Sequence, residues 1–381
     1  MLFIGIATGC VGFVMAIQMG LNPKFLANEL SFDGSQVGVL EAVRESCGIL
    51  ALVVLAALAG LAESRVGSVM LVLLGVGIAG YFRVGTLAWI VPMSLVWSIG
   101  LHVWMPLPNS MTLALAEPDK RGHRLGQIQA AGAVGFCVAL VLMWTLTFVL
   151  HVPMRPFYVV AGVAALLGAA ACLWIPRGIK TPGPRLVFRR KYALYYLLNL
   201  LEGWRKQIAI AFAGFLLAKV YQTSLLTLLL LGGLPQIFLY FASPVVGKLI
   251  DRVGERKILI FYYSSMTVLF VGYAFVPNAY VLYGIFVIDN AFFVFAMAIS
   301  TYVSAIVPKE ELTPTFSMGV AMNHVAAVTM PLVGGFLWIT WGYKWTFLAG
   351  ALAAALSVFV ATRVPQRVKH EPGAAPVPSE Y

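Results

Sequence analysis

Two similar polar stretches organise the chain: residues 247–257 read GKLIDRVGERK, and residues 60–67 read GLAESRVG. Each stretch lies between two long apolar segments, and their first residues, 60 and 247, are 187 positions apart. Corresponding loops separated by half a chain are typical of an internal duplication. The sequence therefore predicts two repeated halves that meet near the middle of the chain.

The composition places most of the chain in lipid. Of the 381 residues, 61% are hydrophobic and 11% are charged, whereas soluble proteins carry about 25% charged residues. A helix needs about 20 apolar residues to cross a bilayer. Continuous stretches of this kind predict helices rather than barrel strands. Twelve such stretches cover residues 2–28, 35–59, 67–83, 86–114, 126–150, 155–175, 192–218, 223–246, 257–276, 279–306, 314–338 and 344–363.

The net charge of +11 indicates membrane topology rather than a nucleic-acid partner, because the basic residues recur in short groups between the apolar stretches. If the N-terminus is cytoplasmic, 18 of the 26 basic residues lie on the cytoplasmic side, five lie on the opposite side and three lie within spans. Such an excess of Lys and Arg marks cytoplasmic loops. We therefore expect a bacterial-type inner (cytoplasmic) membrane protein with both termini in the cytoplasm.

The most basic interruption divides six predicted spans from six, and it contains the turn-forming sequence TPGP at residues 181–184. It therefore predicts a linker between two domains. We expect an N-terminal half at residues 1–176, a basic cytoplasmic linker at 177–191, a C-terminal half at 192–363 and a polar cytoplasmic tail at 364–381.

The loop at residues 247–257 resembles the signature loop of the major facilitator superfamily, which reads G-x-L-a-D-R-x-G-R-K. The loop at residues 60–67 keeps this pattern less well, with Glu63 in the aspartate position. The resemblance covers essentially the whole chain and implies an all-α membrane protein with twelve transmembrane helices in two pseudo-symmetric six-helix halves. The matching positions are Gly247, Leu249, Asp251, Arg252, Gly254, Arg256 and Lys257.

The resemblance further implies that this loop is a conformational latch between the halves. From the residues alone, Gly247 permits close helix approach and Gly254 permits a tight turn, whereas the basic residues hold the loop in the cytoplasm. A simple topology anchor is the alternative. The residues assigned to the latch are Gly247, Asp251, Arg252, Gly254, Arg256 and Lys257.

Ionisable side chains within a span are costly and mark functional sites. The seventh span contains EGWRKQ at residues 202–207, near the middle of its length. Glu202 lies three residues before Arg205 and four before Lys206, so the three side chains share one helix face. An acid beside two bases can bind a solute, bind a proton or form an internal pair. A purely structural ion network is the alternative.

The tenth span contains Asp289 and Asn290 at a similar depth. Asp289 is a candidate partner for the basic residues of the seventh span or a protonatable carboxylate. His324 in the eleventh span and His102 in the fourth can titrate near neutral pH, or they can be packing residues held by hydrogen bonds. The family resemblance implies that helices one, four, seven and ten line the cavity.

The second span carries Glu41, Arg44 and Glu45 at helical spacing. These residues lie closer to the predicted outer end of their span than Glu202 lies to the end of its own. We therefore expect an outer gate or an interhelical pair rather than a substrate site.

Several chemical functions lack their sequence signals. The chain has no nucleotide-binding glycine loop, no HExxH and no GxSxG, and its four cysteines form no CxxC. We therefore predict no enzyme activity, no cofactor and no metal site. The glycine-proline motif of the family's efflux antiporters is also absent from the fifth span, although MPLVGG occurs at residues 330–335 in the eleventh.

These observations predict a secondary active transporter of a small organic solute that works by alternating access with proton coupling. An organic anion suits Arg205 and Lys206, whereas proton-coupled export of a hydrophobic or cationic compound suits Glu202 and Asp289. The expected partners are the solute, protons and the lipid bilayer, with no nucleic acid, and the chain is expected to be monomeric. A transporter-like sensor or assembly partner without net transport is the alternative.

Overall fold

The computed structural model describes residues 1–117, 121–180, 188–307 and 309–366. Within its helices, the side chains of residues 121–123, 236, 240, 243, 244, 251, 309, 310 and 312–314 are also left undescribed. The centre of the predicted linker and most of the predicted tail therefore lie outside the described residues. Across the described ranges the chain is helical, apart from turns and an isolated antiparallel bridge between Ala62 and Lys180.

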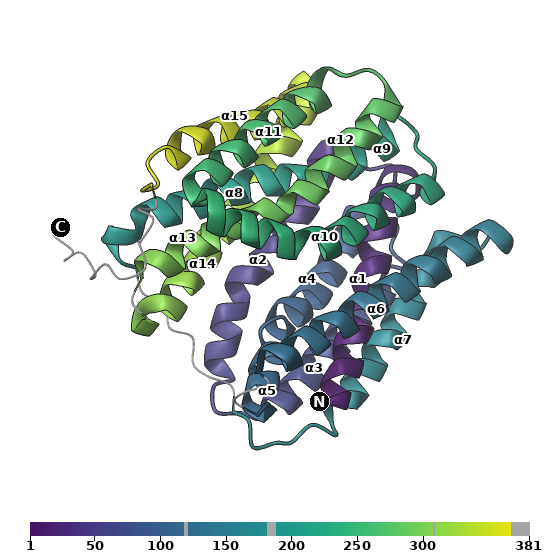
Figure 1. The fold of residues 1–381 in the computed structure, drawn as a ribbon. Helices are drawn as coiled ribbons and strands as arrows, with labels where there is room; N and C mark the ends of the chain where they lie inside the picture. Colours follow the sequence, from purple (N-terminus) through teal and green to yellow (C-terminus); the bar gives the residue numbers. More distant parts are fainter. Residues whose placement is uncertain (118–120, 181–187, 308, 367–381) are drawn as a thin grey trace, which may run out of the picture.

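The N-terminal half occupies the lower right of Figure 1 in purple, blue and teal. Its helices are α1 (Leu2–Lys24), a π-helical turn η1 (Phe25–Glu29), α2 (Gly34–Ala57), α3 (Glu63–Gly80), α4 (Leu87–Trp104), α5 (Leu107–Leu115), α6 (Arg121–Val149) and α7 (Met154–Cys172).

The C-terminal half occupies the upper left of the same view in green and yellow. It begins with the short 3₁₀ helix η3 (Arg190–Tyr192) and α8 (Ala193–Ile208), followed by the π-helical turn η4 (Ala209–Ala213), α9 (Gly214–Lys219), α10 (Leu225–Val253) and α11 (Glu255–Phe275). The remaining elements are α12 (Ala279–Phe292), the 3₁₀ turn η5 (Phe293–Ala296), α13 (Met297–Ile306), α14 (Lys309–Trp341) and α15 (Tyr343–Ala361).

Nine helical segments of the described chain are long and apolar enough to cross a membrane. The helix α2, the run from α8 to α9 and the helix α10 add three further segments in the order expected from the sequence. Two of these three carry a charged cluster, which lowers their hydropathy. The architecture thus agrees with the predicted twelve spans, and the charged spans are the ones that hydropathy alone identifies least well.

Helix interruptions occur at matching places in the two halves. The first and seventh spans contain the π-helical turns η1 and η4, whereas the fourth and tenth are broken between α4 and α5 and at η5. Pro106, at the break after α4, cannot continue the backbone hydrogen bonding of a helix. Irregular backbone at membrane depth is tolerated where it is enclosed by protein or lines a cavity. The pattern therefore supports an internal repeat. It also makes these four spans candidates for lining a cavity.

The two halves meet most closely where α2 packs on α14. A Cβ atom at Gly38 would overlap the carbonyl group of Pro331, and one at Gly34 would overlap the ring of Trp338. Glycine therefore permits the close approach of these two helices. In the last turn of α1, Lys24 Nζ also donates a hydrogen bond across the halves to the carbonyl oxygen of Thr223, at 2.7 Å.

Candidate functional site

A cavity of about 280 Å³ lies between the two halves. The elements that line it include α1, α2, α8, α10 and α12, together with the turns η4 and η5. Both π and 3₁₀ interruptions of the C-terminal half therefore border the cavity. Its walls carry five charged side chains, which are Glu41, Arg44, Arg205, Lys206 and Asp289.

Arg205 is the centre of the charged cluster on the C-terminal side of the cavity, and 2% of the residue is exposed. Its Nη2 atom donates to Glu202 Oε1 at 2.6 Å, and its Nη1 atom donates to Asp289 Oδ1 at 3.3 Å. The structure therefore brings the predicted residues of the seventh and tenth spans together. A charge buried to this extent requires such partners.

Tyrosines of α11 complete this cluster, and no specific sequence signal pointed to them. Tyr262 accepts a hydrogen bond from Arg205 Nη2 at 2.8 Å and donates one to Glu202 Oε1 at 3.0 Å. Tyr273 donates to Asp289 Oδ2 at 3.4 Å. Tyrosines are common in apolar spans, so only the packing of α11 beside α8 and α12 reveals this role.

Lys206 also lines the cavity, but its contacts differ from those of Arg205. Its ammonium group lies 5.4 Å from the ring centre of Phe293, which is a cation–π contact. Among the described residues, no carboxylate forms an ion pair with it. Asn290 lines the same cavity and donates to the carbonyl oxygen of Phe286 at 2.9 Å. Lys206 thus presents a positive charge to the cavity without a direct ion pair among the described residues.

The charged residues of α2 form a second cluster on the N-terminal side. Arg44 Nη2 lies 2.5 Å from Glu41 Oε2 and 2.9 Å from Glu45 Oε1. The sequence suggests an outer gate here, but the structure places Glu41 and Arg44 on the wall of the central cavity. The sequence prediction counted residues from the end of the span, which gives the depth of a side chain along its own helix. That depth does not specify which other helices the side chain faces.

His324 lies apart from the Arg205 cluster and contacts the N-terminal half instead. Its ring centre is 5.6 Å from that of His102, in an edge-to-face arrangement. A Cβ atom on Gly48 of α2 would overlap the His324 ring. The predicted coupling residues are therefore divided between two places, with His324 in the contact between the halves.

The predicted latch loop is described in part. Gly254 has a φ angle of 89° between α10 and α11, so the tight turn expected at this glycine is present. A Cβ atom at Gly247 would meet no described atom within 4 Å. The close helix approach expected at this glycine is therefore not seen in this conformation. Arg252 and Lys257 are exposed, and Arg256 is half-buried. The side chain of Asp251 lies outside the described residues.

The corresponding loop of the N-terminal half is held by specific contacts. Glu63 is fully buried, and its Oε1 atom accepts a hydrogen bond from Ser110 of α5 at 2.6 Å. Its backbone amide donates to the carbonyl oxygen of Ile179 at 2.9 Å. The start of the predicted linker is therefore attached to this loop.

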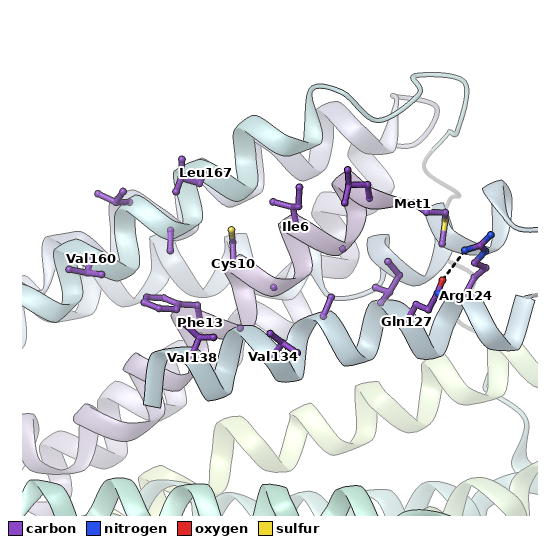
Figure 2. A pocket seen from close by; sticks show the side chains of 18 residues that line it. Met1, Ile6, Cys10, Phe13, Arg124, Gln127, Val134, Val138, Val160 and Leu167 are labelled. Carbon is purple, nitrogen blue, oxygen red and sulfur yellow. Dashed lines mark hydrogen bonds between the residues drawn. The ribbon is translucent and has the colours of Figure 1, made fainter. Parts of the chain in front are cut away.

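A larger cavity of about 870 Å³ lies away from these clusters, between α1, α6 and α7. Figure 2 shows its lining of apolar side chains, including Phe13, Val138 and Leu167, with Arg124 and Gln127 at one end. Its lining lacks the paired charges of the central cavity. In a membrane protein such an apolar surface is suited to lipid, so we place the candidate site in the smaller central cavity.

Comparison with known proteins supports the family resemblance. Residues 192–379 match the family model described as Major Facilitator Superfamily. The multi-drug resistance efflux pump PmrA of Streptococcus pneumoniae is 32% identical over 109 residues, or 28% of this chain. The match covers 27% of the pump, so the chain spans about a quarter of the length of this curated relative.

Solved transporter structures share the fold over nearly the whole chain. The nucleoside transporter NupG is 16% identical, with a TM-score of 0.76 over 94% of this chain and 96% of that chain. The D-xylose-proton symporter is 14% identical, with a TM-score of 0.67 over 95% of this chain and 96% of that chain. A bacterial homolog to the human lysosomal transporter Spinster has a TM-score of 0.70, with 14% identity over 95% and 96% of the two chains. These likenesses confirm the predicted fold.

Proposed function

Because the chain is a multi-pass membrane protein of the major facilitator superfamily, we propose that it is a secondary active transporter for a small organic solute. The observation that carries this proposal is the central cavity, which is lined from both halves and contains charged groups of both signs. A site between two repeated halves is accessible to each side in turn when the halves rock against each other. We assign this alternating access to the cytoplasmic membrane, with both termini in the cytoplasm.

We assign solute binding to Lys206. Its ammonium group is held by the Phe293 ring rather than by a carboxylate, so it can receive an anionic or strongly electronegative group of the solute. Arg205 is less available because its Nη1 and Nη2 atoms already donate to Asp289 and Glu202. The solute class that fits best is therefore a small organic molecule with an anionic or electron-rich polar group.

We assign proton coupling to the Arg205 cluster. Glu202 and Asp289 together carry two negative charges against the single positive charge of Arg205, so one negative charge is unbalanced within this group. Protonation of either carboxyl group removes the excess charge. It also frees a guanidinium donor, which changes the contacts between α8 and α12. This change links proton binding to helix movement.

The names of similar proteins guide the choice of test solutes. The structural neighbours include a nucleoside transporter and a xylose-proton symporter, and the sequence relative is a drug efflux pump. The first test uses purified protein in liposomes and measures flux of nucleosides, pentoses, organic acids and drug-like cations, with and without a pH gradient. The proposal expects gradient-dependent flux of at least one compound, competed by compounds of the same class.

Lys206→Met is the decisive variant for solute binding. Loss of the ammonium group should raise the apparent KM at least ~10-fold, because a charged hydrogen bond contributes about 1.5–3 kcal/mol. Lys344→Met is the matched control, since Lys344 makes a similar cation–π contact with Phe275 on an exposed surface. An unchanged KM in Lys206→Met would remove Lys206 from the solute site. A ligand that binds without flux would favour the sensor alternative.

A further inference from the structure

Three potential metal ligands meet at the contact between the halves. Glu45 belongs to α2, His102 to α4 and His324 to α14, and one donor atom from each lies within 4.8 Å of the others. In Figure 1, α2 lies between α4 and α14, and it packs on both helices. Each of the three side chains is half-buried, so the group is accessible to a small ion.

Hydrogen bonds orient both imidazole rings. His102 Nδ1 lies 2.9 Å from the carbonyl oxygen of Ser98, and His324 Nδ1 lies 2.9 Å from the carbonyl oxygen of Val320. A carbonyl oxygen only accepts, so each Nδ1 atom carries a proton and Nε2 is the nitrogen that a neutral ring offers to a metal ion. Histidines that bind metals are commonly held in this way by a backbone carbonyl.

The position of the His324 ring points its free nitrogen toward α2. A Cβ atom on Gly48 would overlap Nε2 of His324, and Gly48 lies three residues after Glu45, on the same side of the helix. Glycine at this position therefore leaves space for the ring beside the carboxylate.

The carboxylate of the group has cationic neighbours on two helices. Arg44 of α2 contacts both Glu41 and Glu45, and Lys206 of α8 lies near enough to Glu45 to interact with its charge. Arg44 bonds to Oε1 of Glu45, which leaves Oε2 as the free carboxylate donor. A ligating carboxylate that is itself hydrogen-bonded is typical of metal sites.

We propose that Glu45, His102 and His324 form a binding site for a divalent transition-metal ion of the Zn²⁺ class. Two imidazole nitrogens and one carboxylate oxygen suit Zn²⁺ rather than Mg²⁺ or Ca²⁺, which prefer oxygen ligands. Water completes the coordination in sites with three protein ligands.

Metal binding at this site links the two halves. Ligands around a tetrahedral Zn²⁺ ion lie about 3.4 Å apart, given metal–ligand bonds of about 2.1 Å. The present separations of up to 4.8 Å must therefore shrink by up to about 1.4 Å. Since His324 comes from one half and the other ligands from the other half, the ion stabilises the state in which α2 and α14 are in contact. This site does not depend on the proposed solute or on proton coupling.

The test uses the full chain after removal of any affinity tag and treatment with a chelator. Isothermal titration with ZnCl₂ should give one site per chain, and Co²⁺ should give the visible absorption of a four-coordinate complex. His102→Gln and His324→Gln should each weaken Zn²⁺ binding at least ~100-fold. His151→Gln, which changes an exposed histidine between α6 and α7, is the matched control and should leave the affinity unchanged.

A measurement on the unaltered protein keeps the test valid if a variant fails to fold. Zn²⁺ should protect His102 and His324, but not His151, from carbethoxylation read by mass spectrometry. Absence of stoichiometric Zn²⁺ binding, or binding that persists in both histidine variants, would overturn the site and leave a hydrogen-bonded contact alone. Failure of the solute-flux assay would leave these binding results unaffected, so the two proposals are tested separately.

Discussion

The charged clusters of α2 and α8 begin with the same local pattern and end in different environments. Each contains a glutamate three residues before an arginine, followed directly by another charged residue. On α8 the arginine is enclosed by partners from its own half, at Glu202, Tyr262 and Asp289. On α2 the last residue is Glu45, which lies beside a histidine from the opposite half.

This difference gives the two clusters different possible roles. The α8 cluster can change its protonation without breaking a contact between the halves, which suits the coupling role that we propose for it. The α2 cluster lies against α14 of the other half, so a movement of the halves would change its contacts. Local spacing alone does not distinguish these cases, because the partner helices determine them.

The largest expected effect is the loss of Arg205. In Arg205→Met the carboxylates of Glu202 and Asp289 remain buried without their common partner, which should destabilise the protein by about 3–5 kcal/mol. Arg44→Met should cost less, because 12% of the Arg44 side chain is exposed, compared with 2% for Arg205. Thermal unfolding in detergent compares the two. Equal losses of stability would contradict the expected difference between the buried Arg205 and the more exposed Arg44.

A charge-balanced double variant tests whether the α8 cluster is only structural. Glu202→Gln combined with Arg205→Met removes one charge of each sign and should recover part of the stability lost in Arg205→Met. If the cluster is a structural ion pair alone, the double variant should also transport normally. We expect it to fold better than Arg205→Met but to remain defective in coupled flux.

The next effect concerns coupling. Glu202→Gln should retain ligand binding but reduce the dependence of flux on the pH gradient at least ~10-fold, because glutamine cannot take up and release a proton. Glu41→Gln should change flux in the same proportion with and without the gradient. The measurement is the ratio of the two rates in liposomes. An unchanged ratio in Glu202→Gln would transfer the coupling role to Asp289.

A smaller effect is expected from Tyr262→Phe. The hydroxyl group joins Glu202 and Arg205, so its removal should cost about 1–2 kcal/mol of stability. Tyr158→Phe is the matched control, because Tyr158 is buried and its hydroxyl has no hydrogen-bond partner among the described residues. Chemical or thermal unfolding compares the variants. Equal losses would show that the Tyr262 hydroxyl is not a specific part of the cluster.

The smallest effect is expected at the cytoplasmic surface proposed for the bundle. Glu311 accepts a hydrogen bond from Tyr192 at 2.8 Å and lies 3.1 Å from Lys191 Nζ. The Tyr192 hydrogen bond and the Lys191 charge lower the pKa of Glu311 from its ordinary value. Its stabilising effect is therefore present above the unfolded-state pKa and is lost as pH falls through the lowered folded-state pKa.

Glu311→Gln should remove this pH dependence. The difference in melting temperature between the native chain and the variant should be small at neutral pH and should vanish in acid. Added salt should reduce the difference further, because the Glu311 side chain is partly exposed to solvent. A difference that grows as the pH falls would contradict the sign of this prediction.

The sequence predicted the helical membrane fold. Residue spacing within single helices also predicted which charged side chains share a helix face. Continuous apolar runs have one stable solution in lipid, because each backbone amide must bond within its own helix. The same argument identified Glu202 and Arg205 as neighbours, since residues three apart share a helix face. The tight turn at Gly254 followed from the residue type itself.

Helix packing determines which of these residues meet across helices. Asp289 joins Arg205 from α12, whereas His324 joins His102 and Glu45 from α14. These contacts depend on the rotation and depth of each helix relative to its neighbours, and residue spacing within one helix contains no information on either. For this reason the sequence determined the spans and their charged faces, and the packing of the two halves determined the sites.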